Sequence, residues 1–216
     1  MKAVLISIRP EWCAKIASGE KTIEVRKTRP KQNPPLKVYI YCTLPRYPHE
    51  DFIETDYPKP QFYGGGKVIG EFVCDWIYQY SSADHLYGVD ISHEDMARQS
   101  CLTRKQIEAY ELKNASEEGY GYLGVFGWHI SNLKIYDKPL ELSKFRVEDK
   151  AAIKACKHRF RAGQPEYVAR HGGWLQGGWG CMKTGEPEWC ENCLTKPLTS
   201  PPQSWCYVEE TDNDKT

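Results

Sequence analysis

Residues 5–27, LISIRPEWCAKIASGEKTIEVRK, predict a strand, a helix and a second strand in immediate succession. The apolar run at the start is typical of a buried strand. Pro10 suits the first turn of a helix, because its missing N–H is not needed there. Trp12 and Ile16 lie one helical turn apart, and Gly19 is typical of a helix end. The strict alternation that follows predicts the second strand.

The second strand has one apolar and one charged face. Side chains alternate along a strand, so Ile23 and Val25 share one face, and Glu24 and Arg26 share the other. Lys21 stands at the mouth of this strand, beside the turn. We expect the apolar pair to face a core. The charged pair then either lines a ligand cleft or forms an exposed ion pair on a solvated sheet face.

A ligand cleft at this place would also draw on other strands. Ser7 and Arg9 follow the alternation of the first strand, and Glu71 shares a face with Asp75 in a later one. Arginine suits a planar acceptor, lysine suits a point anion, and a carboxylate can accept a hydrogen bond or transfer a proton. The expected ligand-binding set is Ser7, Arg9, Lys21, Glu24, Arg26, Glu71 and Trp205.

The rest of the chain predicts an α+β fold, a small mixed β-barrel with two insertions. Further strands are expected at residues 37–43, 64–80 (with Gly70 as a candidate kink), 120–136 and 201–210. The insertions in this single domain are a helical, acidic segment at about 83–118 and a second segment at about 144–200, with a basic helix at 147–160. The turn PPQSW would deliver Trp205 to one end of the barrel.

The formal net charge is +0, which argues against a generic polyanion binder, but the charge is unevenly distributed. Residues 1–37 hold nine basic and three acidic residues, a net charge of +6. Residues 47–118 hold six and fourteen, a net charge of −8, and residues 144–171 hold eight and three, a net charge of +5. This asymmetry permits a basic face for an anionic ligand, or it marks solvated surfaces without a partner.

The sequence predicts a soluble, cytoplasmic protein without a membrane partner. No apolar run approaches the roughly eighteen residues of a membrane span. Arg9, Glu11 and Lys15 interrupt any signal-peptide core near the N-terminus. In such a compartment the nine cysteines favour free core thiols or metal ligation over a disulfide framework.

Beginning at residue 5, the chain resembles the ASCH domain of the PUA-like superfamily. The G-x-K-x-x-E-x-R hallmark of that family stands here as Gly19, Lys21, Glu24 and Arg26. The resemblance covers about 3–80, 120–142 and the last strand, and implies a PUA-like β-barrel whose cleft binds RNA, nucleotides or modified nucleosides.

One branch of the superfamily is an acetylcytidine amidohydrolase with a Lys, Thr and Glu triad. Lys21 matches that lysine, but Glu24 stands at the threonine position, which argues against this chemistry. Other members of the superfamily are ribonucleases.

The segment GCMKTGEPEWCENCLTKPL predicts a zinc site that orders a weakly periodic insertion. Its C-x8-C-x2-C spacing offers Cys181, Cys190 and Cys193 as three thiolate ligands for a tetrahedral ion. The candidates for the fourth ligand are Cys156, His158, His171 and Cys206. A structural zinc is the favoured interpretation, with free or redox-active thiols and a catalytic metal as alternatives. We expect small core residues at Cys13, Cys42, Cys74 and Cys101.

Three functions fit these patterns. The first is binding of RNA or a nucleotide-type ligand in the cleft of Lys21, Glu24 and Arg26. The second is hydrolysis of RNA or a modified nucleoside, with Glu24 as general acid or base and with Lys21 or Arg26 stabilising anionic charge. The third is a protein-interaction module that uses the aromatic, Cys-rich insertion as its surface.

Overall fold

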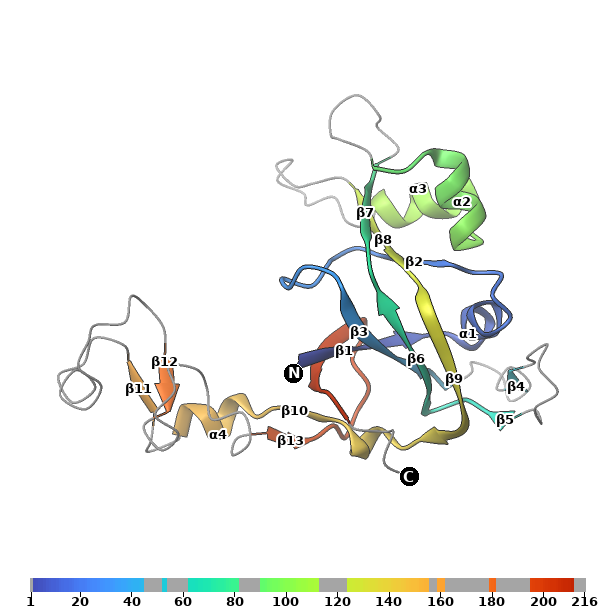
Figure 1. Ribbon diagram of the computed structural model, residues 1–216. Coiled ribbons are helices and arrows are strands. Elements are labelled where there is room, and N and C mark those ends of the chain that lie inside the picture. The colour runs from blue at the N-terminus through green and yellow to red at the C-terminus, as the bar shows by residue number, and fades with distance from the viewer. Residues whose placement is uncertain are drawn as a thin grey trace.

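The computed structural model describes residues 2–44, 52–53, 62–81, 90–112, 124–155, 159–161, 179–181 and 195–211. The fold is α+β. The opening stretch forms β1 (Lys2–Ile8), helix α1 (Pro10–Ala17) and β2 (Ile23–Arg26), as the sequence predicts. Pro10 lies in the first turn of α1, and Gly19 adopts a left-handed φ of 79° just beyond its end. This succession places β1 and β2 in two different sheets (Figure 1).

The larger sheet has five strands in the order β14-β1-β3-β6-β9. Its further members are β3 (Leu36–Cys42), β6 (Lys67–Cys74), β9 (Ser131–Leu140) and β14 (Trp205–Glu209). Strands β1 and β3 are parallel, and the other neighbours are antiparallel. The smaller sheet has the order β2-β8-β7, with β7 (Ile77–Tyr80) and β8 (Val125–His129). A separate short pair joins β4 (Phe52–Ile53) to β5 (Phe62–Tyr63).

Two chain segments pass from one sheet to the other. The strand expected at 64–80 is divided at Asp75 and Trp76 into β6 and β7, and the strand expected at 120–136 is divided at Ile130 into β8 and β9. The ladders of the described residues form these separate sheets and do not close into the single barrel that we expected. Gly70 lies where the register of β6 shifts, and a Cβ there would stand 2.4 Å from the carbonyl oxygen of Lys134.

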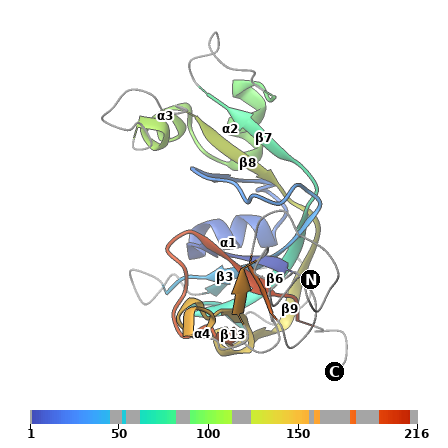
Figure 2. The same ribbon diagram turned by 90° about the vertical axis from the view of Figure 1, so that its left-hand side faces the viewer.

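Three clusters of apolar side chains stabilise this arrangement. Figure 2 shows the two sheets one above the other, with α1 between them. The inner cluster joins residues of β1, β3 and β6 to Trp128 of β8 and to Cys13 and Ile16 of α1. A second cluster covers the outer face of the five-stranded sheet, around Tyr39 and Phe145. The third lies on the far side of the three-stranded sheet. Both faces of each sheet are therefore covered in part.

The helical insertion forms part of the third cluster. Helix α2 (His93–Ser100) and helix α3 (Arg104–Leu112) confirm the expectation of helices within 83–118, and they pack against the three-stranded sheet. Ser92 caps α2 by accepting a hydrogen bond from the Asp95 N–H. Met96, which is fully buried, anchors this helix to the sheet.

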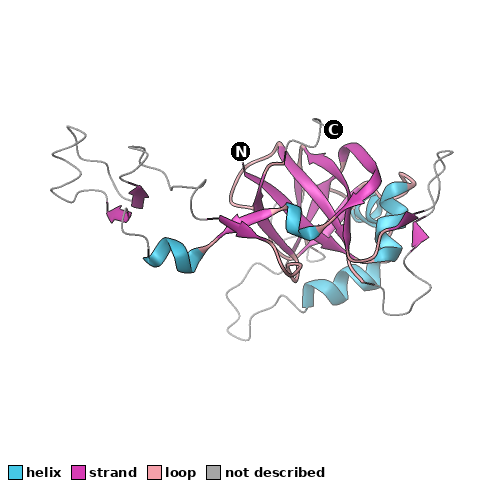
Figure 3. Ribbon diagram, turned by 90° about the horizontal axis from the view of Figure 1, so that it is seen from below, coloured by secondary structure: helices cyan, strands magenta, loops and turns pink. Residues whose placement is uncertain are grey.

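The second insertion begins beside the five-stranded sheet and extends away from it (Figure 3). The short helix η1 (Leu142–Lys144) leads into β10 (Arg146–Glu148), which pairs with β13 (Thr195–Pro197). The basic helix expected at 147–160 is shorter than predicted: α4 spans Lys150–Ala155. It starts late because Asp149 accepts hydrogen bonds from the N–H groups of two alanines in its first turn. Strand β11 (Arg159–Arg161) follows and pairs with β12 (Trp179–Cys181).

Among the described residues, no helix has the length and hydrophobicity needed to cross a membrane.

Candidate functional site

Strand β2 directs its charged side chains into the space between the two sheets. Glu24 lies opposite Trp128, and Arg26 lies opposite Phe126, in the register of β2 and β8. Both aromatic side chains pack in the inner cluster, so Glu24 and Arg26 share that face. Ile23 packs on the other face, in the cluster that α2 and α3 cover. The alternation predicted from the sequence is therefore correct, but both faces of the strand are covered.

The three charged residues of the hallmark form one buried ion cluster, which we call the inner cluster site. Glu24 Oε2 lies 3.4 Å from Lys21 Nζ, and Glu24 Oε1 lies 3.1 Å from Arg26 Nη2. The exposed fractions of the three side chains are 2% for Lys21, 8% for Glu24 and 10% for Arg26. The alternative of an exposed ion pair on a solvated face is therefore wrong. Two cations share one carboxylate, which leaves an excess positive charge of one.

Backbone carbonyl groups complete the coordination of both cations. Lys21 Nζ donates to the carbonyl oxygen of Ser100 at 2.6 Å, and Arg26 Nη2 donates to that of Ser7 at 2.6 Å. The ammonium of Lys21 also lies 5.2 Å from the centre of the Trp12 ring, a favourable position for a cation. These contacts compensate part of the desolvation of the two charges.

Two N–H donors beside the cluster are buried without an acceptor among the described residues. They are Arg26 Nε and Trp128 Nε1. Arg26 and Trp128 are diagonal neighbours on the same face of the three-stranded sheet, a separation of about 7–8 Å between Cα atoms in typical sheets. A buried donor without a partner costs about 1–3 kcal/mol. An acceptor group supplied from outside would remove this penalty.

The turn before β14 lies next to the inner cluster site. Ser7 donates a hydrogen bond from Oγ to the carbonyl oxygen of Pro202 at 2.7 Å, and its N–H donates to the carbonyl oxygen of Ser204 at 2.9 Å. The ring of Trp205 lies 5.8 Å from that of Trp128, and its Nε1 donates to Thr28 Oγ1 at 3.0 Å. The ring of Trp205 thus lies next to the site, whereas Ser7 meets Arg26 only through its backbone carbonyl, and its hydroxyl is bound to Pro202.

Two residues of the expected set lie elsewhere. Arg9 is exposed and pairs only loosely with Glu11, at 3.8 Å. Glu71 lies opposite Tyr39 in the register of β3 and β6, on the outer face of the five-stranded sheet. Side chains alternate along both β2 and β6, but alternation alone does not say which face of a strand lies between the two sheets. The face of β6 that carries Glu71 is the outer one, so Glu71 does not meet Glu24.

The predicted zinc ligands fall largely outside the described residues. Those outside are Cys156, His158, His171, Cys190 and Cys193, while Cys181 is the last residue of β12. Cys206 packs with Val208 in the second apolar cluster, on the outer face of the five-stranded sheet, and burial raises the pKa of its thiol to about 11. In the part of the chain that the structure describes, no three His, Cys, Asp or Glu side chains are grouped as a metal site. The zinc site stays a prediction.

The other cysteines are core residues with one exception. Cys13, Cys42 and Cys74 are buried in the inner apolar cluster, as predicted. Burial is the main reason that the pKa of Cys74 is raised to about 12, and it also raises the pKa of Cys13. Such thiols are poor nucleophiles at neutral pH. Cys101 was expected in the core, but it is partly exposed and ends α2 in a left-handed conformation with φ 57°.

Sequence reasoning missed the contributions of Ser100 and Trp128. The Ser100 carbonyl belongs to a segment 79 residues away from Lys21, and a backbone acceptor leaves no signature in the side-chain pattern. Trp128 could have been found from the register of its strand, because the alternation of apolar residues places it on the same face as Phe126. The sequence pattern alone reads it as a core residue, which it also is.

The solved structures to which the chain is similar include ASCH proteins. No family model matches the chain, and no curated protein matches its sequence. The crystal structure of ASCH from Zymomonas mobilis has 20% sequence identity and a TM-score of 0.42, over 65% of this chain and 73% of that chain. The chain is similar to ASCH proteins of known structure. A mutant form of the Zymomonas mobilis ASCH protein gives 19% identity and a TM-score of 0.42, over 66% of this chain and 77% of that one. Another mutant form gives 16% identity and a TM-score of 0.47, over 96% of this chain and 89% of that chain.

Proposed function

We propose that the chain binds RNA or a nucleotide-type anion at the inner cluster site. The observation that carries this proposal is the buried excess of positive charge in Lys21, Glu24 and Arg26. An unbalanced buried charge is unfavourable unless a counter-charge reaches it. An anionic oxygen of a ligand would balance the charge, and either an anionic or a carbonyl oxygen would give Arg26 Nε the acceptor that it lacks among the described residues.

The donors at the site suit a phosphate or a base edge. Lysine carries three N–H donors, and Glu24 and Ser100 supply acceptors for two of them. The guanidinium of Arg26 is held by Glu24 and Ser7 through Nη2, which fixes its plane. A fixed arginine plane is suited to an acceptor that presents two oxygens or an oxygen and a ring nitrogen.

The adjoining surface also favours a polyanion with aromatic groups. The segment that follows β2 carries Arg29 and Lys31, both exposed, and the Lys31 N–H donates to the hydroxyl of Tyr207 at 2.8 Å. Tyr207 packs edge-on against Trp205, with 5.5 Å between ring centres, and both are partly exposed. Basic residues next to aromatic rings contact phosphates and stack bases in single-stranded nucleic acids.

The geometry favours binding over hydrolysis by Glu24. Both oxygens of this carboxylate contact cations, and its side chain is 8% exposed. A general base must lie within hydrogen-bond reach of the proton that it takes. Glu24 therefore serves in this proposal as the bridge that holds two ligand-binding cations at fixed positions.

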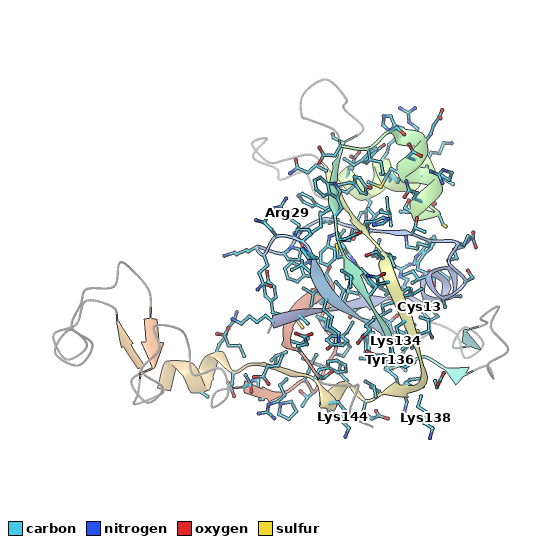
Figure 4. The ribbon with its side chains drawn as sticks, viewed as in Figure 1. Cys13, Arg29, Lys134, Tyr136, Lys138 and Lys144 are labelled. Atoms are coloured by element: carbon cyan, nitrogen blue, oxygen red, sulfur yellow. The ribbon has the colours of Figure 1, made fainter. Side chains whose placement is uncertain are left out.

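The experiment is a titration of a short fluorescein-labelled single-stranded RNA and of nucleoside monophosphates, by fluorescence anisotropy and calorimetry. The test variant is Arg29→Gln with Lys31→Gln, which changes exposed residues only. Its matched control is Lys138→Gln with Lys144→Gln, two exposed lysines at the lower edge of the molecule in Figure 4, away from Arg29. We expect the test variant to weaken RNA binding and to reduce the salt slope by about 0.7 for each phosphate that the protein no longer neutralises.

Equal binding by the test and control variants would contradict the proposed surface. Arg26→Lys keeps the charge but removes the planar donor, and we expect it to weaken the binding of monophosphates as well as of RNA. If the labelled RNA is shortened during the titration, the hydrolase alternative replaces simple binding. If neither RNA nor a monophosphate binds the wild-type protein, the proposed function is wrong.

A further inference from the structure

The ammonium of Lys21 is held by the carboxyl end of α2, in the middle of the helical insertion. Lys21 Nζ donates to the carbonyl oxygen of Ser100, the last residue of α2, at 2.6 Å. The next residue is held in the same way, because the Thr22 N–H donates to the carbonyl oxygen of Gln99 at 2.9 Å. Two consecutive carbonyl groups of α2 thus fix two consecutive residues directly before β2.

The end of a helix is suited to this task. The last carbonyl groups have no partner within the helix, and the helix dipole places partial negative charge there. A cation at this position is therefore stabilised. Ser100 is fully buried, so the contact is shielded from competing water. The capped amino end at Ser92 and the buried side chain of Met96 fix the helix on the sheet.

Cys101 terminates α2 at the point where these carbonyl groups turn toward β2. Its φ of 57° and ψ of 25° are left-handed, and its N–H donates back to the carbonyl oxygen of Arg98. Its Sγ contacts the carbonyl oxygen of Glu20, which directly precedes Lys21. A left-handed conformation is strained for β-branched residues and is tolerated by asparagine and glycine. The backbone at residue 101 therefore controls where the helix ends.

We infer that the carboxyl end of α2 positions the Lys21 ammonium for ligand binding, so that the helical insertion is a working part of the site and more than a cover of the sheet. The inference rests on the proposed function for its effect on binding. Ser100 and Cys101 act through Lys21 and are positioning residues. Glu24, at 3.4 Å, and the Trp12 ring attract the ammonium without a short hydrogen bond, whereas the carbonyl of Ser100 accepts one at 2.6 Å and so fixes its position.

The test is a variant with strain at residue 101, Cys101→Val, with two readouts. The first is the rate of acylation of Lys21 by an N-hydroxysuccinimide ester, measured by peptide mass spectrometry, which rises when the ammonium is released. The second is affinity for the labelled RNA, with and without Lys21→Met. We expect faster acylation and a loss of affinity of up to about tenfold, the factor that corresponds to the strain of a β-branched residue in this conformation. In a Lys21→Met background, Cys101→Val should cause no additional loss of RNA affinity.

The rescue variant is Cys101→Asn, which tolerates the left-handed conformation and should restore slow acylation and the affinity. Ser92→Ala removes the amino-terminal cap of α2, and it provides a milder loosening if Cys101→Val does not fold. Glu108→Gln, at a partly exposed position of α3, is the matched control in the same insertion and should change neither readout. Circular dichroism and thermal unfolding check the fold of each variant.

Unchanged acylation in both Cys101→Val and Ser92→Ala overturns the inference, whatever happens to RNA binding. Faster acylation with unchanged affinity shows that α2 holds Lys21 but not for the ligand, and this also overturns it. If the wild-type protein binds no RNA, the proposed function fails, while the acylation rate still decides whether α2 holds the ammonium.

Discussion

Two clusters of lysine and glutamate lie on opposite sides of the five-stranded sheet. The inner cluster site joins Lys21, Glu24 and Arg26 between the sheets, where the most exposed side chain is 10% exposed. The outer cluster joins Lys37 to Glu71 at 3.3 Å, with exposed fractions of 27% and 17%, and Glu71 accepts a hydrogen bond from Tyr136 at 2.5 Å. The residue types are nearly the same, but the environments differ.

The difference lies in charge balance and in backbone acceptors. The inner site has one cation in excess and uses carbonyl groups of two distant segments as additional acceptors. In the outer cluster one cation, Lys37, is instead shared by two carboxylates, because it also lies 3.9 Å from Glu210, and these side chains are partly exposed to solvent. Exposed pairs contribute little to stability, whereas a buried pair that loses one partner destabilises strongly. Burial therefore separates a candidate ligand site from an ordinary surface ion pair that ties the C-terminal segment to β3.

The largest expected effect is that of Glu24→Gln, which leaves two buried cations without a counter-charge. We expect it to lower the free energy of unfolding by about 3–5 kcal/mol. The matched change in the outer cluster, Glu71→Gln, should cost about 1 kcal/mol or less. Urea unfolding followed by circular dichroism measures both. Similar losses for the two variants would show that the clusters do not differ as their burial indicates.

Lys21→Met should have an intermediate effect, because it removes the excess cation and leaves Glu24 paired one to one with Arg26. The loss arises mainly from the Ser100 carbonyl, which loses its donor, and amounts to about 1–3 kcal/mol. Lys37→Met is the counterpart in the outer cluster and should change the free energy of unfolding by less than about 1 kcal/mol. A loss for Lys21→Met as large as that for Glu24→Gln would contradict the charge count of the inner site.

The sequence predicts that β2 has one apolar and one charged face, but it does not predict that both faces are buried. Alternation places Glu24 opposite in direction to Ile23, and this is correct because it depends on local strand geometry alone. Which face of each strand lies between the two sheets depends on how the sheets pack, so the expectation that Glu71 lines the same cleft as Glu24 is wrong. The Ser100 carbonyl could not have been foreseen, because a contact across 79 residues through a backbone atom has no residue-type preference.

The element boundaries show the same division between local and tertiary causes. Helix α1 follows from Pro10 and Gly19, which act locally. The break between β6 and β7 does not follow from residue preferences, because Asp75 and Trp76 lie where the chain leaves one sheet for the other. Gly70, the candidate kink, is required instead by the close approach of the Lys134 carbonyl.

The smallest expected effect is the loss, at high pH, of the stabilisation that Lys37 gives to the folded state. Partial burial, the largest single influence, lowers the pKa of Lys37, but the charges and hydrogen bonds of Tyr39 and Glu71 together raise it above the ordinary value of 10.5. A group whose pKa is raised by folding stabilises the folded state fully below its unfolded pKa, and this contribution is lost as the pH rises through the folded value. The stability difference between wild type and Lys37→Met should thus be constant up to about pH 10 and shrink above it. Urea unfolding across this range measures it, and in a Glu71→Gln background the shrinkage should move to lower pH. A difference that grows with pH would mean that Lys37 is not stabilised by its neighbours, and the outer cluster would then contribute nothing to the attachment of the C-terminal segment.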